Sequence, residues 1–229
     1  MSDEFDRQKR QVADYAVQSI RPGMVIGLGG GTTARYAMRR VAALLELGDL
    51  ADILAIPCSL LVEADAQRLG IPLTTLEDHP LIDLTIDGAD EVTGEKYLIK
   101  GGGGALLREK IVAQASRREI IIVDERKYSP MLGTHALLPV EVVPFGWRLQ
   151  AEYLESLGAV ITVRLAADSI PYRTDQNNYI LDCDFGPIAH PAELANRLAA
   201  RAGIVEHGLF LGVASEVVIA RESGIEVIT

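Results

Sequence analysis

Short apolar runs alternate with helical patterns along the first 130 residues, and this alternation restricts the possible folds more than any other feature of the sequence. Buried strands are predicted at 24–28, 52–56, 84–87, 97–100 and 119–123. Helices are predicted between them, at 6–20, 32–47, 59–69 and 105–115. Apolar strands joined by amphipathic helices are typical of a parallel sheet with helices on both faces. The sequence therefore predicts an α/β fold with a doubly wound, mainly parallel, Rossmann-like sheet.

The pattern changes after about residue 132. A strand at 138–144, a helix at 147–157, strands at 159–164 and 178–185, and a helix at 191–202 follow one another. This order predicts a smaller α+β domain at 133–205, inserted into a Rossmann-like catalytic domain formed by 1–132 and 206–229. Two further strands, at 208–213 and 216–220, are expected to return to the first sheet.

Charge and composition exclude several classes of function. The 229 residues carry 22 Lys and Arg against 32 Asp and Glu, a formal net charge of −10. Such a chain repels nucleic acid, so a nucleic-acid partner is not expected. No apolar run is long enough to span a bilayer, and the charged N-terminus lacks the apolar core of a secretory signal. A cytoplasmic protein without a membrane partner is therefore expected.

Neither the cysteines nor the histidines form a metal-binding pattern. Cys58 and Cys183 make no CxxC pair, and the four histidines make no HxH or HExxH arrangement. A disulfide framework or a structural metal is therefore not expected, and no cofactor is predicted.

The first segment that could carry chemistry is Gly27–Thr33, between a predicted strand and a predicted helix. Glycines let the backbone approach an anion, and a helix N-terminus offers N–H groups and a positive dipole end. The segment departs from GxGxxG at Thr32 and has no GK[ST], which disfavours a nucleotide site. A phosphate cradle is favoured over a tight turn with a threonine N-cap. Its members would be Gly29, Gly31, Thr32 and Thr33.

The second segment, Asp87–Glu91, places three carboxylates at the end of a predicted buried strand. Carboxylates at the end of a buried strand cost free energy unless water reaches them or they have hydrogen-bond partners or a functional role. A pair of acid–base groups, a magnesium site and an exposed acidic turn all remain open on these residues alone.

The third segment, Lys100–Lys110, contains the four successive glycines 101–104. Such a run is entropically costly to order, and it suits backbone amides that wrap an oxyanion. Lys100 could stabilise developing negative charge, and Glu109, about one turn into the next helix, could face the same cleft. A flexible linker is disfavoured because periodic apolar elements flank the glycines on both sides.

A fourth segment, Asp124–Lys127, follows the strand at 119–123, and its Lys127 could neutralise a phosphate. A solvated charged loop is the more frequent explanation of such a run. All four segments follow predicted strands, and ligands bind at the carboxyl ends of the strands in open α/β sheets. We therefore expect the segments to converge.

Together these segments resemble the motifs of the ribose-5-phosphate isomerase type A family. The family stretches GxGTGST, DGADE and KGGGGALLREK correspond to residues 27–33, 87–91 and 100–110. The last two match essentially residue for residue, and the resemblance continues through 138–145 to the chain end. One departure is Gly30, where the family usually has threonine.

The resemblance implies interconversion of D-ribose 5-phosphate and D-ribulose 5-phosphate through a cis-enediolate, in the pentose phosphate pathway. It implies Glu109 as general base, Asp87 in ring opening, and Asp90 and Lys100 on the sugar oxygens. The phosphate would be bound by Thr32, Thr33 and Lys127, with Lys9 as a further contact. The amides of Gly101, Gly102 and Gly103 suit the developing oxyanion. The family is homo-oligomeric, commonly dimeric, and needs no metal.

Three other functions remain as alternatives. A sugar-phosphate deaminase or lactonase could share the sheet and the phosphate loop, but would not predict the DGADE and KGGGG segments together. A sugar-phosphate sensor should lack catalytic carboxylates. A magnesium-dependent phosphatase would lose activity on treatment with EDTA, whereas the isomerase should not.

Overall fold

The structure, a computed structural model, describes residues 2–229 and divides into two compact units. The first unit contains the residues up to 89 together with 108–128 and 212–229. The second contains 90–107 and 129–211, and so takes in 90–107 in addition to the stretch 133–205 that the sequence predicts for a smaller domain. The predicted domain boundaries stay a prediction.

The first unit is built on a six-stranded sheet in the order β13-β12-β6-β3-β1-β2. All its neighbouring pairs are parallel except β12 with β13. The strands are β1 Val25–Leu28, β2 Leu54–Pro57, β3 Leu84–Asp87, β6 Glu119–Asp124, β12 Glu216–Arg221 and β13 Gly224–Ile228. Every residue of β3 and β6 is buried, as expected of central parallel strands covered on both faces. The predicted mainly parallel α/β sheet is confirmed.

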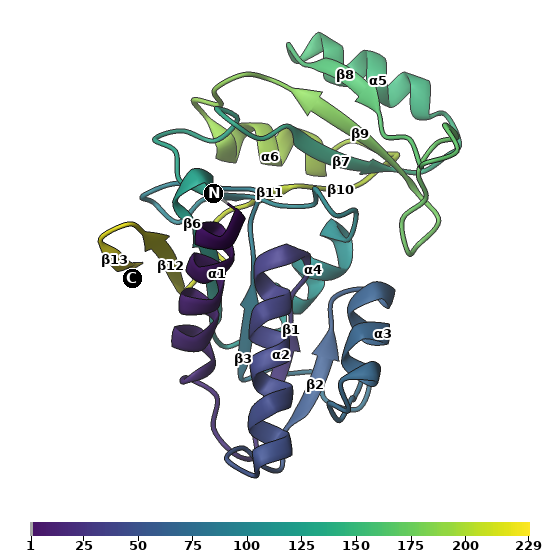
Figure 1. Cartoon of the computed structure of the whole chain (residues 1–229). Helices are drawn as coiled ribbons and strands as arrows, with labels where there is room; N and C mark the ends of the chain where they lie inside the picture. Colours follow the sequence, from purple (N-terminus) through teal and green to yellow (C-terminus); the bar gives the residue numbers. More distant parts are fainter. Residues whose placement is uncertain (1) are drawn as a thin grey trace. The chain divides into compact units, whose positions relative to one another are not determined.

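Four helices accompany this sheet: α1 Ser2–Val17, α2 Gly31–Leu47, α3 Leu60–Arg68 and α4 Leu106–Gln114, whose first two residues belong to the second unit. Helices α1 and α2 lie side by side (Figure 1). Their apolar faces, including Val12 and Val41, join strand residues such as Ile26 and Ile120 in one core. A short 3-10 helix, η1 Glu125–Lys127, follows β6.

The second unit contains an antiparallel four-stranded sheet in the order β10-β7-β9-β8. Its elements are β7 Leu138–Val142, α5 Trp147–Ser156, β8 Val160–Val163, β9 Tyr179–Asp184, α6 Pro191–Ala199 and β10 Ile204–His207. Val140, Leu154, Leu181 and Leu198 are fully buried in its core. The predicted order strand–helix–strand–strand–helix is confirmed.

A small three-stranded sheet in the second unit corrects two predictions. It consists of β4 Glu91–Val92, β5 Leu98–Ile99 and β11 Leu209–Phe210, in the order β11-β5-β4. The strand predicted at 208–213 therefore does not return to the first sheet, and the strand predicted at 97–100 is not part of that sheet. The cause is a close approach: a Cβ on Gly208 would lie 2.3 Å from the Lys100 carbonyl oxygen, which allows β11 to pair with β5. The prediction for 216–220 is correct, because β12 pairs with β6.

Candidate active site

Close packing between β1 and β3 accounts for two of the glycines in the first motif. A Cβ on Gly27 would lie 1.9 Å from Thr85 Oγ1, and one on Gly29 would lie 2.2 Å from Asp87 Oδ1. Gly31 has a φ of +80°, in the left-handed region that side chains disfavour. The glycine run thus brings the backbone after β1 against the end of β3.

Asp87 is held at the carboxyl end of β3 by backbone amides. Its Oδ1 accepts hydrogen bonds from the N–H groups of Gly30 (2.9 Å) and Gly88 (2.7 Å). The side chain is buried, so an exposed acidic turn is the wrong interpretation of this residue. Two amide donors orient the carboxylate and compensate part of the cost of burying it.

Glu109 meets Asp87 from another element. It lies in the first turn of α4 and is 7% exposed. A Cβ on Gly30 would lie 3.2 Å from Glu109 Oε1 and 3.6 Å from Cys58 Sγ. One ligand atom from each of Cys58, Asp87 and Glu109 lies within 4.8 Å of the others. The first unit thus brings together the two carboxylates that the sequence singles out, and adds a thiol beside them.

Cys58 was not among the residues predicted for the site. It comes directly after β2, a parallel neighbour of β1, so its position after a predicted strand was the signal that could have found it. A thiol and two carboxylates could hold a divalent metal ion, with the thiolate favouring a soft metal such as zinc. The same carboxylates can also exchange protons with a ligand.

The N-terminus of α2 has the amide donors that an anion site requires. The helix starts at Gly31, and its N-cap is Gly30, which has no side chain to accept a first-turn N–H. The alternative of a threonine N-cap is therefore wrong. Thr32 and Thr33 lie in the first turn, where helix amides have no partner within the helix and the dipole favours an anion.

Two lysines predicted to bind phosphate lie on adjoining elements of the first unit. Lys127 ends η1, and Lys9 lies in α1 next to Gln8, whose Nε2 donates to Glu125 Oε1 of η1 at 3.4 Å.

The neighbouring Arg126 is engaged by Asp124, through Nε to Oδ1 at 2.8 Å and an Nη to Oδ2 at 2.9 Å. Burial by itself raises the pKa of Asp124, but the hydrogen bonds and charge of Arg126 outweigh it and hold that pKa below its ordinary value. The charged loop therefore presents Arg126 to Asp124, and the charge of Lys127 lowers the pKa of Asp124 in the same direction. The phosphate-binding role of Lys127 stays a prediction.

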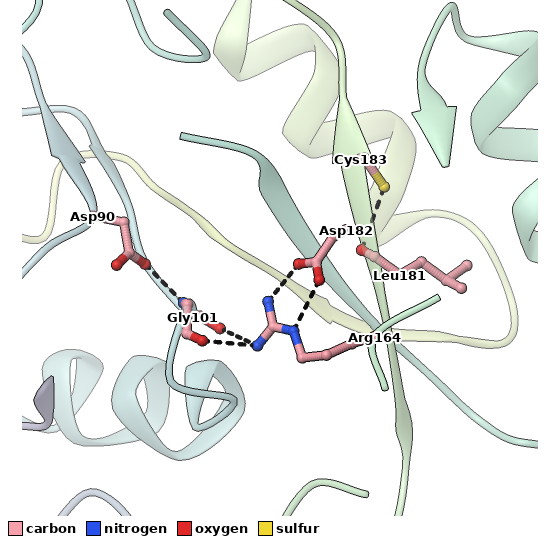
Figure 2. A network of polar contacts seen from close by, with 7 residues as sticks. Asp90, Gly101, Arg164, Leu181, Asp182 and Cys183 are labelled. Carbon is pink, nitrogen blue, oxygen red and sulfur yellow. Dashed lines mark hydrogen bonds and ion pairs between the residues drawn. The ribbon is translucent and has the colours of Figure 1, made fainter. Parts of the chain in front are cut away.

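In the second unit, the glycine loop is tied to the DGADE segment. The N–H of Gly102 donates to Asp90 Oδ2 at 2.7 Å, and Figure 2 shows Asp90 pointing to this loop. A Cβ on Gly102 would lie 2.8 Å from Asp90 Oδ1, so only glycine allows this approach. Gly103 is exposed, with no atom within 4 Å of a Cβ built there. Lys100 is buried, with Nζ 5.5 Å from the centroid of the Phe210 ring.

Glu91, the third carboxylate of the DGADE segment, stabilises the structure of a loop. Glu91 is fully buried and accepts four hydrogen bonds from the segment 129–135. Its Oε1 accepts from the Ser129 hydroxyl (2.5 Å) and from the N–H groups of Thr134 and His135, and its Oε2 accepts from the N–H of Gly133 (2.7 Å). Glu91 therefore anchors a loop of the second unit.

The family model for ribose 5-phosphate isomerase A (phosphoriboisomerase A) matches residues 54–224 of the chain. The chain belongs to this family. Ribose-5-phosphate isomerase A of Chloroflexus aurantiacus is 56% identical over 224 residues, which cover 98% of this chain and 94% of the relative. A relative from Arabidopsis thaliana, named probable ribose-5-phosphate isomerase 3, chloroplastic, is 45% identical over 98% of this chain and 83% of its own length.

Solved structures of ribose-5-phosphate isomerases share the whole fold. The enzyme from Plasmodium falciparum is 39% identical, with a TM-score of 0.94 over 98% of each chain. A D-ribose-5-phosphate isomerase in complex with phospho-erythronic acid is 33% identical, with a TM-score of 0.95 over 97% of this chain and 98% of the other. Among residues 2–229, no helix has both the length and the apolar character that crossing a membrane requires.

Proposed function

We propose that this chain, a ribose-5-phosphate isomerase, interconverts D-ribose 5-phosphate and D-ribulose 5-phosphate by proton transfer, with Glu109 as the general base. The observation that carries the proposal is the meeting of buried Glu109 with amide-bound Asp87. Both carboxylates belong to motifs that match the family residue for residue. A base beside a second, fixed carboxylate suits a reaction in which protons are moved between neighbouring atoms.

The reaction begins with ring opening, which Asp87 assists by exchanging a proton with the ring and anomeric oxygens. Glu109 then removes the proton from C2 of the open aldose, and the electron pair of that bond forms the C1–C2 double bond of the enediolate. Glu109 returns a proton to C1, while the hydroxyl proton on O2 is lost and O1 gains one. The product is the C2 ketone, and no redox partner is needed.

Negative charge that develops on O1 and O2 needs fixed donors. Lys100 and the amides of Gly101 and Gly103 are the proposed donors. The N–H of Gly102 instead holds Asp90, which would orient a hydroxyl. A pre-organised donor of this kind typically contributes about 3–4 kcal/mol to the transition state.

The phosphate serves as a remote anchor. Thr32, Thr33 and the amides of Gly29 and Gly31 at the start of α2 are the proposed cradle, with Lys127 and Lys9 supplying positive charge. Binding energy from this end orients the reacting carbons. The phospho-erythronic acid bound by a solved relative is a sugar-acid phosphate, the same chemical class of ligand.

We infer a place in the pentose phosphate pathway, a homodimeric state and a cytoplasmic location from the family resemblance and the composition. The chloroplastic name of the Arabidopsis relative shows that the location of relatives varies.

The test is the substitution Glu109→Gln, which keeps the shape and removes the base. We expect kcat to fall about 10²–10⁴-fold with binding of D-ribose 5-phosphate retained. Glu63→Gln is the matched control, because Glu63 is also in the first turn of a nine-residue helix of the same unit. Turnover of Glu109→Gln equal to that of Glu63→Gln would remove Glu109 from the role of base.

A metal-dependent phosphatase is the second candidate, because Cys58, Asp87 and Glu109 could hold a metal ion. A phosphatase would release inorganic phosphate from the sugar phosphate, and this activity would be lost when EDTA is added. These two results together would favour the phosphatase over the isomerase.

A further inference from the structure

An arginine that is distant in sequence from the glycine loop donates hydrogen bonds to carbonyl oxygens of that loop. Arg164 follows β8, and its Nη1 donates to the carbonyl oxygens of Gly101 at 2.9 Å and Gly102 at 3.0 Å. Figure 2 shows the guanidinium reaching this loop from the β8–β9 side of the second unit. No sequence motif singled out Arg164.

Arg164 is itself fixed by a carboxylate. Its Nε donates to Asp182 Oδ2 at 2.9 Å, and its Nη2 donates to Oδ1 of the same residue. Asp182 lies in β9, opposite Thr162 of β8. Each side chain of the pair is only 16% exposed. A bidentate arginine–carboxylate pair that is mostly buried holds the guanidinium in one orientation, which a solvated surface pair does not.

The peptide between Gly101 and Gly102 connects this pair to the DGADE segment. Its carbonyl accepts from Arg164, and its N–H donates to Asp90 Oδ2 at 2.7 Å. A trans peptide directs its C=O and N–H to opposite sides. Fixing the Gly101 carbonyl therefore directs the N–H of Gly102 to Asp90, and fixing the Gly102 carbonyl directs the N–H of Gly103, a proposed donor to the enediolate. A cation on the carbonyl side polarises both peptides and makes these N–H groups better donors.

Tyr172, which pairs with the backbone of Arg164, also restricts the far end of the loop. A Cβ on Gly104 would lie 2.4 Å from the Tyr172 hydroxyl oxygen, and the N–H of Tyr172 donates to the Arg164 carbonyl at 2.8 Å. Gly104 also has a φ of +86°. The four-glycine loop is thus held at both ends, which offsets the freedom that its composition would otherwise give it.

We infer that Arg164 is a positioning residue for the isomerisation, which acts by fixing and polarising the peptides of Gly101 and Gly102, with Asp182 holding it in place. The inference rests on the proposed roles of the Gly103 amide as a donor to the enediolate and of Asp90, held by the Gly102 amide, in orienting the sugar. It assigns to Arg164 an effect on the transition state and none on the binding of the phosphate end.

The experiment compares Arg164→Met with Arg164→Lys, by steady-state kinetics with D-ribose 5-phosphate. For Arg164→Met we expect kcat to fall about 10- to 100-fold, since misplacement by about 1 Å can cost about 10²-fold, with KM changed less than about 2-fold. Arg164→Lys keeps the positive charge but not the planar guanidinium with its several donors. Its kcat should therefore lie between that of Arg164→Met and that of the parent.

Arg173→Met is the matched control. Arg173 lies in the same unit, donates to the Asn177 carbonyl and the Tyr179 hydroxyl, and stacks over the Tyr179 ring. Its loss removes a comparable arginine without touching the glycine loop, so turnover should be retained. Asp182→Asn is the second variant if Arg164→Met does not fold. It should lower kcat in the same direction, because the guanidinium loses its charged partner.

The inference is overturned if folded Arg164→Met or Asp182→Asn turns over like Arg173→Met, or if KM rises while kcat is unchanged. It is also overturned if Arg164→Lys is no better than Arg164→Met. Glu109→Gln in the same assay separates the two hypotheses. If Glu109→Gln is inactive and Arg164→Met is active, only the positioning role fails. If Glu109→Gln is active, the proposed mechanism fails first.

Discussion

Backbone amides and close approaches by glycine backbone position the carboxylates of Asp87 and Asp90. Asp87 is oriented by the N–H groups of Gly30 and Gly88, and Asp90 by that of Gly102. Glycine lets the backbone come near both carboxylates, because a Cβ on Gly29 would lie 2.2 Å from Asp87 Oδ1 and one on Gly102 would lie 2.8 Å from Asp90 Oδ1. The glycines therefore help to position the carboxylates, in addition to their proposed role in binding the phosphate.

A single lysine tests the phosphate anchor. Lys127→Ala should raise KM for D-ribose 5-phosphate about 10-fold and leave kcat within about 2-fold, because a charged hydrogen bond to a remote phosphate contributes about 1.5–3 kcal/mol to ground state and transition state alike. Lys96→Ala, in the turn between β4 and β5, is the control in the same steady-state assay. A KM for Lys127→Ala equal to that of Lys96→Ala would exclude Lys127 from the phosphate site.

The sequence identified Asp87, Asp90 and Glu109 because they stand in motifs with a chemical reason for each residue type. It did not identify Cys58 or Arg164. Cys58 comes after β2, and which strands lie next to β2 is decided by the order of strands in the sheet, which the sequence does not give. Arg164 acts through the main-chain carbonyls of a loop 62 and 63 residues away. Contacts between side chains and distant backbone leave no pattern in a sequence.

Strand β7 carries a buried acid outside the proposed site. Glu141 is 1% exposed, and its Oε1 accepts hydrogen bonds from the Thr174 hydroxyl (2.8 Å) and Asn178 Nδ2 (2.9 Å). Burial raises the pKa of Glu141 above its ordinary value despite these hydrogen bonds, and the charges of Glu206 and Asp175 act in the same direction. The folded protein therefore binds this proton more tightly than the unfolded chain does.

Linkage gives the sign of the pH effect. The stability that Glu141 contributes is fully present below the ordinary carboxyl pKa of 4.5, and it is lost as the pH rises through the raised pKa of the folded state. Glu141→Gln has no such loss. The unfolding free energy of the variant relative to the parent should therefore increase between about pH 4 and pH 8.

Urea unfolding at both pH values measures this difference, with Glu152→Gln on the exposed side of α5 as the control. A difference between Glu141→Gln and the parent that stays constant, or decreases with pH, would contradict the assignment of a raised pKa to Glu141.

Among the elements, those with long apolar runs were the predictable ones. β6 is buried along its whole length, and its sequence is apolar except at its two ends. β3 is also fully buried, although two of its four residues, Thr85 and Asp87, are polar. β10 and β13 have mostly half-buried or exposed residues, and β4 has only two residues, so none of them has a clear period. β11 was predicted as a strand but assigned to the wrong sheet, because strand pairing depends on the approach at Gly208 and not on hydrophobicity.

At the scale of the whole molecule, the motif residues are divided between the two compact units. Asp87, Glu109 and the start of α2 belong to the first, whereas Asp90, Lys100 and the glycine loop belong to the second. The formal charge of −10 opposes an anionic substrate in general. Local donors, namely helix amides, glycine amides and lysines, must therefore supply the attraction.

The most direct test of proton transfer by this protein is isomerisation in deuterium oxide. Purified protein is incubated with D-ribose 5-phosphate until equilibrium, and the D-ribulose 5-phosphate is examined for deuterium at C1 by NMR. A carboxylate base that exchanges its proton with solvent predicts deuterium at C1, formed by the parent and not by Glu109→Gln. Ketose that retains only the hydrogen of the substrate after many turnovers would contradict the enediolate mechanism.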